Sequence, residues 1–238
     1  IVPVYQLRQG SDVAEPFYTM RLVAGKTLRE LITLHHVELK RRDQVNLLNI
    51  LCTVCQTIAY AHSQGVIHRD LKPDNIVVGE FGEIFVLDWG LAKVVTEETA
   101  TSDQAPSYPG ATSSETNPLG KTVVGTRIGT PAYMAPEQAA GDTDQIGFQT
   151  DVYGLGAILF EILTGQPPHQ ATDTDALIEQ IQQTPTPTAR SFQSAVPPAL
   201  EAICSKAMSK GPSQRYASPL ELKNEIQSWI ADEPINCY

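Results

Sequence analysis

The sequence has few basic residues, few cysteines and only short apolar runs, and each shortage excludes a class of protein. Its 238 residues carry 17 Lys and Arg against 27 Asp and Glu, a net charge of −10, so no basic stripe is available for nonspecific nucleic-acid binding. Four cysteines are too few for a disulfide framework and predict a reducing compartment, the cytoplasm. The apolar run 154–163 is too short to span a bilayer and contains Glu161, so we expect no membrane contact from this segment. A membrane anchor elsewhere in a parent protein stays open.

Cys52 and Cys55 form a Cys-x-x-Cys pair, a spacing that zinc sites use. No second pair of cysteine or histidine residues stands at ligand distance in the sequence. Apolar residues surround the pair at helical spacing, namely Leu47, Leu48, Leu51, Val54, Ile58 and Ala61. We therefore interpret the two cysteines as buried residues of a helix rather than zinc ligands.

Periodicity and turn residues divide the chain into a strand-containing start and a helical remainder. Residues 1–7 and 17–23 are predicted to form a pair of strands. The predicted helices are 27–34, 43–63, 150–164, 173–183, 197–209 and 218–231. The stretch 96–120 is rich in Ser, Thr, Pro and Glu, lacks apolar periodicity and is predicted to be disordered. It is either a tolerated surface insertion or an autophosphorylated regulatory tract.

Two polar motifs flank a predicted hairpin. The segment from His68 to Asn75 reads HRDLKPDN, and Asp88 opens the second motif, DWG. The apolar runs 76–78 and 84–87 enclose a turn that contains glycine, a pattern that predicts a β-hairpin. Antiparallel pairing would bring Asn75 and Asp88 side by side at the open end of this hairpin. An amide oxygen and a carboxylate held together there form a hard-oxygen site suited to Mg²⁺ and its phosphate ligands.

Further motifs follow in a fixed order along the chain. They are MRLV at 20–23, GTPAYMAPE at 129–137, DVYGLG at 151–156 and the pair Arg215 and Tyr216. Together with the two motifs above, they resemble the eukaryotic-type serine/threonine protein kinases in the form common in bacteria, over nearly all of the chain. The resemblance implies an α+β, protein-kinase-like fold with a mostly helical C-lobe, the catalytic-loop β-hairpin, two residual N-lobe strands and the hinge.

The motifs of the family's N-lobe are missing from this sequence. No Gly-x-Gly-x-x-Gly loop and no Val-Ala-x-Lys strand precedes the hinge, so the missing N-lobe is expected upstream. The resemblance assigns 1–23 to residual N-lobe strands and the start of the hinge, 24–232 to the C-lobe and 233–238 to the start of a C-terminal linker. Within the C-lobe it places the catalytic loop at 66–75 and the activation segment at 88–137. We expect this fragment alone to be inactive, because ATP phosphates would lack their cover and their lysine.

The resemblance implies transfer of the ATP γ-phosphoryl group to serine or threonine hydroxyls of protein substrates, with Mg²⁺ as the metal. Asp70 is the implied catalytic base, and Lys72 neutralises charge on the transferred phosphate. Asn75 and Asp88 are the implied Mg²⁺ ligands. A lysine two residues after the aspartate resembles the Ser/Thr-specific branch of the family. The adenine pocket is implied at the gatekeeper Met20, the C=O of Arg21, the N–H of Val23 and the apolar floor Val77.

Regulation by phosphorylation of the activation segment is implied by Arg69 next to Asp70, since a guanidinium there can clamp a phosphothreonine. Thr122 and Thr126 are the candidates for that phosphate, and ordinary loop or strand threonines are the alternative interpretation. Thr130 is expected to face the active site and to help select a hydroxyl side chain.

Other matched positions are expected to be architectural. Glu137 and Arg215 should pair as a buried salt bridge, and Asp151 should brace the catalytic loop through backbone N–H groups. Trp89 stands where the family usually has Phe. We expect its ring to stack on His68 and its indole N–H to require a partner.

Two other functions remain as alternatives. One is a pseudokinase-like binding or scaffold module, and retention of Asp70, Lys72, Asn75 and Asp88 speaks against it. The other is a small-molecule kinase, and the segment 129–137 speaks against that, because it resembles a peptide-docking surface.

Overall fold

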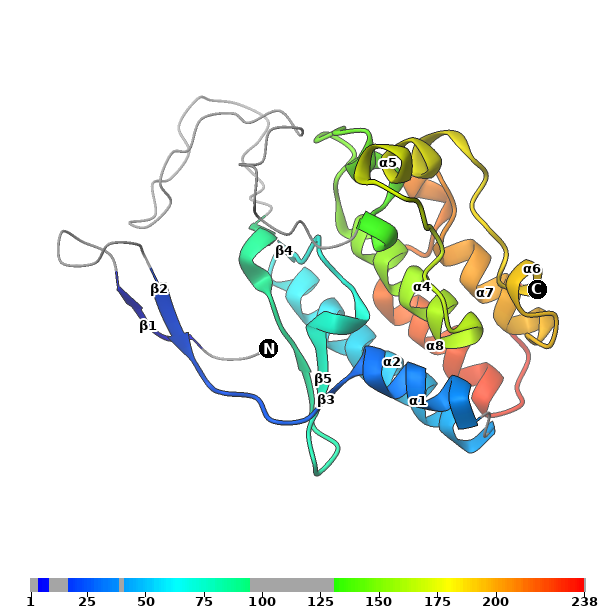
Figure 1. The fold of residues 1–238 in the computed structure, drawn as a ribbon, viewed down its shortest axis with the longest axis horizontal. Coiled ribbons are helices and arrows are strands. Elements are labelled where there is room, and N and C mark those ends of the chain that lie inside the picture. Colours follow the sequence, from blue (N-terminus) through cyan, green and yellow to red (C-terminus); the bar gives the residue numbers. More distant parts are fainter. Residues whose placement is uncertain (1–3, 9–16, 39–40, 95–130, 238) are drawn as a thin grey trace.

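A computed structural model describes residues 4–8, 17–38, 41–94 and 131–237, which form small antiparallel sheets and a larger helical body (Figure 1). The helices are α1 (Leu28–Glu38), α2 (Arg41–Ser63), α3 (Pro136–Ala139), α4 (Phe148–Thr164), α5 (Thr174–Gln183), α6 (Ala189–Phe192), α7 (Pro198–Ala207) and α8 (Pro219–Ile230). The strands are β1 (Val4–Arg8), β2 (Phe17–Met20), β3 (Lys26–Thr27), β4 (Val66–Ile67), β5 (Ile76–Val78), β6 (Ile84–Val86) and β7 (Lys93–Val94). Short 3₁₀ turns lie at Pro73–Asn75, Trp89–Leu91, Pro131–Tyr133 and Pro212–Gln214. Among the described helices, none combines the length and the apolar composition needed to cross a membrane.

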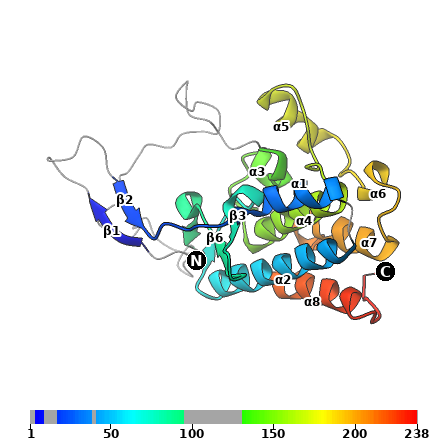
Figure 2. The ribbon, with the colours of Figure 1, turned by 60° about the horizontal axis from the view of Figure 1, so that its bottom comes forward.

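All strand pairs in the described ranges are antiparallel. The predicted hairpin is confirmed as β5 and β6, with Ile76 opposite Val86 and Val77 opposite Phe85. β3 adds a third strand beside β5, so the chain between β2 and α1 runs along the hairpin. β1 pairs with β2 as predicted, and this pair lies to one side of the helical body in both ribbon views (Figures 1 and 2).

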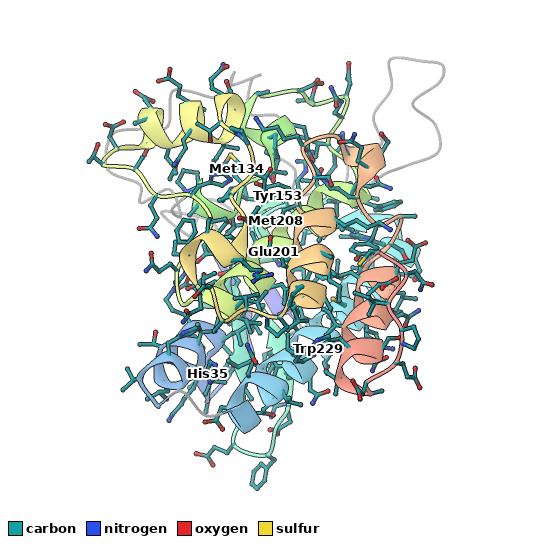
Figure 3. All side chains as sticks on the ribbon, turned by 90° about the vertical axis from the view of Figure 1, so that its right-hand side faces the viewer. His35, Met134, Tyr153, Glu201, Met208 and Trp229 are labelled. Carbon is teal, nitrogen blue, oxygen red and sulfur yellow. The ribbon has the colours of Figure 1, made fainter. Side chains whose placement is uncertain are left out.

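The core of the helical body is built around α4. Every residue from Thr150 to Leu163 is buried, so this helix is enclosed on all sides. It packs against α2, α6, α7 and α8, and α1 packs against α2. Tyr153 of α4 and Met208 after α7 are fully buried in this interior (Figure 3).

The cysteines of α2 belong to the core. Cys52 and Cys55 are 4% and 0% exposed, and both lie in the main hydrophobic cluster. Burial raises the pKa of the Cys52 thiol to about 11 and that of Cys55 well above its usual value. The described residues hold no group of three or more His, Cys, Asp or Glu side chains arranged as a metal site.

Local capping explains where the helices begin and end. α1 starts at Leu28, one position later than predicted, because Thr27 caps it: Glu30 N–H donates to Thr27 Oγ1 (3.2 Å), and Thr27 N–H donates to Glu30 Oε2 (2.7 Å). Gly65 follows α2 with φ +71° and Gly165 follows α4 with φ +76°, a conformation that glycine adopts without strain. The helices predicted at 43–63, 150–164, 173–183, 197–209 and 218–231 are present as α2, α4, α5, α7 and α8.

Candidate active site

One buried carboxylate of α4 binds the backbone of the predicted catalytic loop. Asp151 accepts hydrogen bonds from the backbone N–H groups of His68 and Arg69, both at 2.9 Å. His62 Nε2 lies 2.7 Å from the same carboxylate. Arg69 has φ +70°, a strained value for a residue with a side chain, and Gln138 Nε2 donates to its carbonyl at 2.8 Å. The loop conformation therefore depends on partners brought by α3 and α4.

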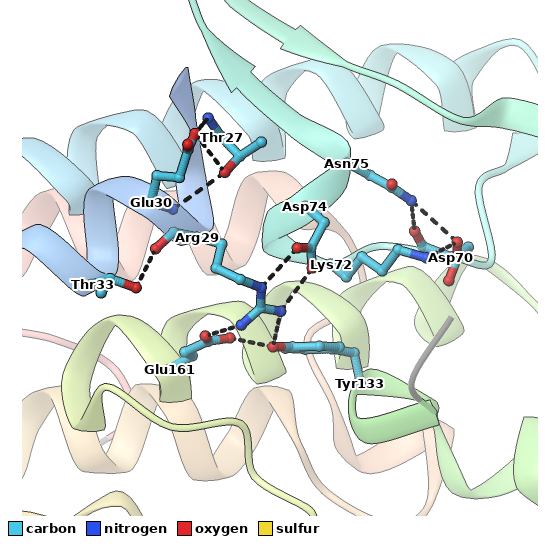
Figure 4. A network of polar contacts seen from close by, with 10 residues as sticks. All are labelled: Thr27, Arg29, Glu30, Thr33, Asp70, Lys72, Asp74, Asn75, Tyr133 and Glu161. Carbon is cyan, nitrogen blue, oxygen red and sulfur yellow. Dashed lines mark hydrogen bonds and ion pairs between the residues drawn. The ribbon is translucent and has the colours of Figure 1, made fainter. Parts of the chain in front are cut away.

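Lys72 and Asn75 both bind the carboxylate of Asp70 (Figure 4). Lys72 Nζ lies 2.7 Å from Asp70 Oδ2, and Asn75 Nδ2 donates to the same oxygen at 3.1 Å and to the Asp70 carbonyl at 2.9 Å. The Asp70 side chain is 27% exposed and that of Lys72 is 15% exposed. The carboxylate is thus fixed in direction while one side of it stays open to a ligand.

Asn75 and Asp88 lie at the open end of the hairpin. Leu87 N–H donates to the Asn75 carbonyl at 2.7 Å, and Asp88 is the next residue. Asp88 is exposed and has φ +59°. Among the described residues, no hydrogen bond joins the two side chains, and the hydrogen bonds of the Asn75 side chain are made by Nδ2 and not by Oδ1. Both groups therefore present oxygen atoms suited to a divalent cation.

Trp89, which follows Asp88, is held in place by contacts with His68 and Val86. Trp89 packs on His68 with ring centroids 4.5 Å apart, and its indole N–H donates to the Val86 carbonyl at 3.0 Å. His68 is fully buried, and burial lowers its pKa. Its Nε2 lies 3.0 Å from the Leu87 carbonyl and its Nδ1 lies 3.3 Å from Asp70 N–H. These contacts fit a neutral imidazole that donates through Nε2 and accepts through Nδ1.

The residues assigned to adenine lie on β2, on the segment that follows it and on β5. Met20 ends β2 and is 44% exposed, whereas Val77 in β5 is buried. Arg21 and Val23 line a pocket together with the turn of the β5–β6 hairpin. The segment approaches β5 closely at Gly25, where a Cβ atom would lie 2.2 Å from the Val78 carbonyl oxygen, so only glycine fits.

Of the residues predicted to be regulatory, only Arg69 lies within the described ranges. Thr122, Thr126 and Thr130 lie outside the described residues. Arg69 is described: its Nε is buried without a hydrogen-bond partner among the described residues, and Arg69 lines a cavity next to Asp70. An orphaned guanidinium nitrogen at a cavity is an available donor for an anion.

Glu137 and Arg215 form a fully buried ion pair. Arg215 Nη1 and Nη2 donate to the two carboxylate oxygens of Glu137 at 2.8 and 2.7 Å, and the two side chains are 0% and 2% exposed. The remaining Arg215 donors bind the carbonyls of Ser209, Lys210 and Gln149. This bidentate pair ties the segment after Pro131 to the chain between α7 and α8.

The sequence reasoning missed a second polar cluster beside the catalytic loop (Figure 4). Arg29 of α1 contacts Asp74 of the loop, Tyr133 and Glu161. The one visible signal was Glu161, a charged residue within the otherwise apolar run 154–163. Nothing in the pattern around Arg29 pointed to its partners.

Comparison with known proteins places these residues in a family. The protein kinase domain family matches residues 15–227. The chain is 35% identical to the serine/threonine-protein kinase PknD of Protochlamydia amoebophila over 97% of its length. It is also 35% identical to PknD of Chlamydia pneumoniae and 34% identical to PknD of Chlamydia felis, over 98% of its length in each case.

The chain spans about a quarter of the length of these curated relatives, 24% of the first and 25% of the other two. The family match covers most of the chain, and its described part is mostly helical with small antiparallel sheets. This chain therefore belongs to the protein kinase domain family and has the protein kinase fold.

Proposed function

We propose that this chain is the C-lobe and hinge of a serine/threonine protein kinase that transfers the ATP γ-phosphoryl group to hydroxyls of protein substrates. The observation that carries the proposal is the Asp70 carboxylate, which Lys72 and Asn75 hold within a loop braced by Asp151. Membership of the family implies ATP use, and the curated relatives are named serine/threonine kinases.

Asp70 orients the acceptor hydroxyl and accepts its proton. Lys72, 2.7 Å from Asp70, places a positive charge where negative charge develops on the transferred group. Most of the rate gain comes from this positioning and charge neutralisation rather than from proton abstraction.

Asn75 Oδ1 and the Asp88 carboxylate are the atoms that would hold Mg²⁺, and their chemistry fits a hard cation. When bound there, the metal neutralises charge on the phosphates. Val77, Met20 and the backbone of Arg21 and Val23 would enclose the adenine.

Arg69 is the proposed receiver of an activating phosphate. The candidate positions are Thr122 and Thr126, and Thr130 is proposed to face the acceptor. The Nε of Arg69, which has no partner in the part of the chain that the structure describes, supports a link between an anion and the predicted catalytic loop.

The test is phosphotransfer from labelled ATP with Mg²⁺ by the natural polypeptide that contains this chain. We expect labelling on Ser or Thr and a fall of about 100-fold or more in Asp70→Ala, the lower range for loss of a positioned acid–base group. Asp144→Ala removes an exposed carboxylate from the loop between α3 and α4 and serves as the matched control.

Residues 1–238 by themselves should transfer little or no phosphate, because this sequence contains no Gly-rich loop and no strand lysine. Folded natural polypeptide that labels nothing would favour a scaffold whose catalytic residues are relics. Robust, Asp70-dependent transfer by residues 1–238 alone would contradict the prediction for the isolated chain.

A further inference from the structure

The cluster around Arg29 joins three parts of the molecule that are distant in sequence (Figure 4). Arg29 Nε and Nη2 donate to the two carboxylate oxygens of Asp74 at 2.8 and 2.7 Å. Its Nη1 donates to Glu161 Oε1 at 2.6 Å, and its Nη2 also donates to Tyr133 Oη at 2.7 Å. Arg29 lies in the first turn of α1, Asp74 in the 3₁₀ turn of the catalytic loop and Glu161 in α4.

The hydroxyl of Tyr133 completes the cluster. It accepts from Arg29 and donates to Glu161, so both of its hydrogen-bonding functions are used. Tyr133 belongs to the 3₁₀ turn Pro131–Tyr133 and is 7% exposed. The position of this turn is therefore set by Arg29 and Glu161 together.

The positive charge of Arg29 stabilises the ionised carboxylates of Asp74 and Glu161. The Glu161 side chain is 3% exposed, and burial raises its pKa. The hydrogen bond from Arg29 lowers the pKa of Asp74. Arginine presents donors on three nitrogens in one plane, and here each of the three has its own acceptors. A lysine ammonium would keep the charge but could not span this set of acceptors in the same geometry.

Both turns tied by Arg29 lie close to Asp70, because Asn75 of the first binds Asp70 and residues of the second line the cavity beside it. Asp74 lies between Lys72 and Asn75, and the Asn75 N–H donates to the Lys72 carbonyl at 3.0 Å within the same turn. Pro131 and Tyr133 line the cavity next to Asp70. The hydrogen bonds of the Arg29 side chain go to Asp74, Glu161 and Tyr133 and not to Asp70, so its effect on catalysis is indirect.

We propose that Arg29 is a positioning residue that holds the catalytic loop and the Pro131–Tyr133 turn in register for the protein acceptor. The inference rests on the proposed kinase function and deepens it. It predicts different effects on the two substrates. Loss of Arg29 should lower kcat/KM for the protein acceptor and leave KM for ATP nearly unchanged.

The experiment uses variants of the natural polypeptide with a peptide acceptor. Arg29→Ala alone would leave Glu161 buried and unpaired, so the decisive variant is the double substitution Arg29→Ala with Glu161→Gln. We expect kcat/KM for the acceptor to fall about tenfold or more while KM for ATP changes less than about threefold. Arg29→Lys should also show a reduced kcat/KM for the acceptor, because lysine keeps the charge but cannot reach all of the acceptor atoms that Arg29 binds. Glu161→Gln alone is the baseline from which the added effect of losing Arg29 is measured, and Arg190→Ala, at an exposed arginine of α6, is the control.

Hydrogen exchange gives a readout that does not depend on activity. In the double variant, amides of the two tied turns should exchange about tenfold faster, whereas amides of α7 and α8 should keep their protection. Unchanged exchange at both turns, unchanged acceptor kinetics, or an equal loss for ATP and acceptor would each overturn the inference. If the unsubstituted polypeptide transfers no phosphate, the proposed function fails, and hydrogen exchange still decides whether Arg29 holds the two turns.

Discussion

Buried histidines of this chain are held neutral by their surroundings. His169 lies in the loop between α4 and α5, is 2% exposed, and its Nε2 is 3.0 Å from the hydroxyl of Tyr153. Burial lowers its pKa to about 4, and the nearby positive charge of Lys210 adds to the effect. The folded protein therefore resists protonation at this site over a range in which the unfolded chain accepts a proton.

We predict that the stability of the fold falls in mild acid partly because of His169. An unfolded histidine titrates near 6.5 and the folded one near 4, so the unfolded state binds more protons between these values and gains stability as the pH drops. The free energy of unfolding should fall by about 2 kcal/mol from pH 7 to pH 5 on account of this group. Urea unfolding at both pH values, with and without His169→Gln, measures the difference. Equal pH dependence in the two proteins would show that His169 titrates normally in the fold.

At the scale of elements, the packing of α4 depends on close approach by its neighbours. Gly156 faces the end of α7, where a Cβ atom would lie 2.8 Å from Ala207 Cβ and 2.8 Å from Met208 Cγ. Gly154 similarly faces Leu71 of the catalytic loop. Because Leu71, Ala207 and Met208 are all buried, none of them can move into solvent to make room for a larger side chain.

Gly156→Val should push α7 away from α4 and lower the free energy of unfolding by about 2 kcal/mol or more, in the range for overpacked cores. Gly211→Val is the matched control, since its nearest neighbour is the flexible side chain of Gln214 and its φ is −76°. Denaturant midpoints for the two variants test the prediction. A Gly156→Val protein as stable as the control would mean that the contact between α4 and α7 is looser than the structure shows.

At the scale of the whole molecule, long-range ion pairs join segments that helix periodicity alone does not connect. Glu137 and Arg215 are separated by 78 positions and bury a bidentate pair between the segment after Pro131 and the turn before α8. Asp151 similarly joins α4 to the catalytic loop. The helical body should therefore unfold as one cooperative unit.

Glu137→Ala should lower the free energy of unfolding by about 3–5 kcal/mol, because it leaves the Arg215 guanidinium buried without its counter-charge. Replacing both partners with Met should cost less than the sum of the two single substitutions, since no charge remains unpaired. A double-mutant cycle followed by urea unfolding measures this coupling. Additive effects of the two substitutions would contradict it.

The parts of the structure that were predictable are local ones. The β5–β6 hairpin and the helices α2, α4, α5, α7 and α8 follow from apolar periodicity and turn residues within short stretches of sequence. The short elements α3, α6, β3, β4 and β7 were not predicted, because two to four residues are too few to show a period. β3 also depends on the hairpin that it joins.

The sequence by itself determined the family and the helices of the core, and it predicts the catalytic loop, because these depend on contiguous motifs and on periodic patterns. Only the tertiary structure decided what holds that loop. Arg29 meets Asp74, Tyr133 and Glu161 across separations of 45, 104 and 132 positions. Such contacts arise when α1 and α4 both pack near the loop, and no local sequence pattern around an arginine shows which carboxylates packing will bring to it.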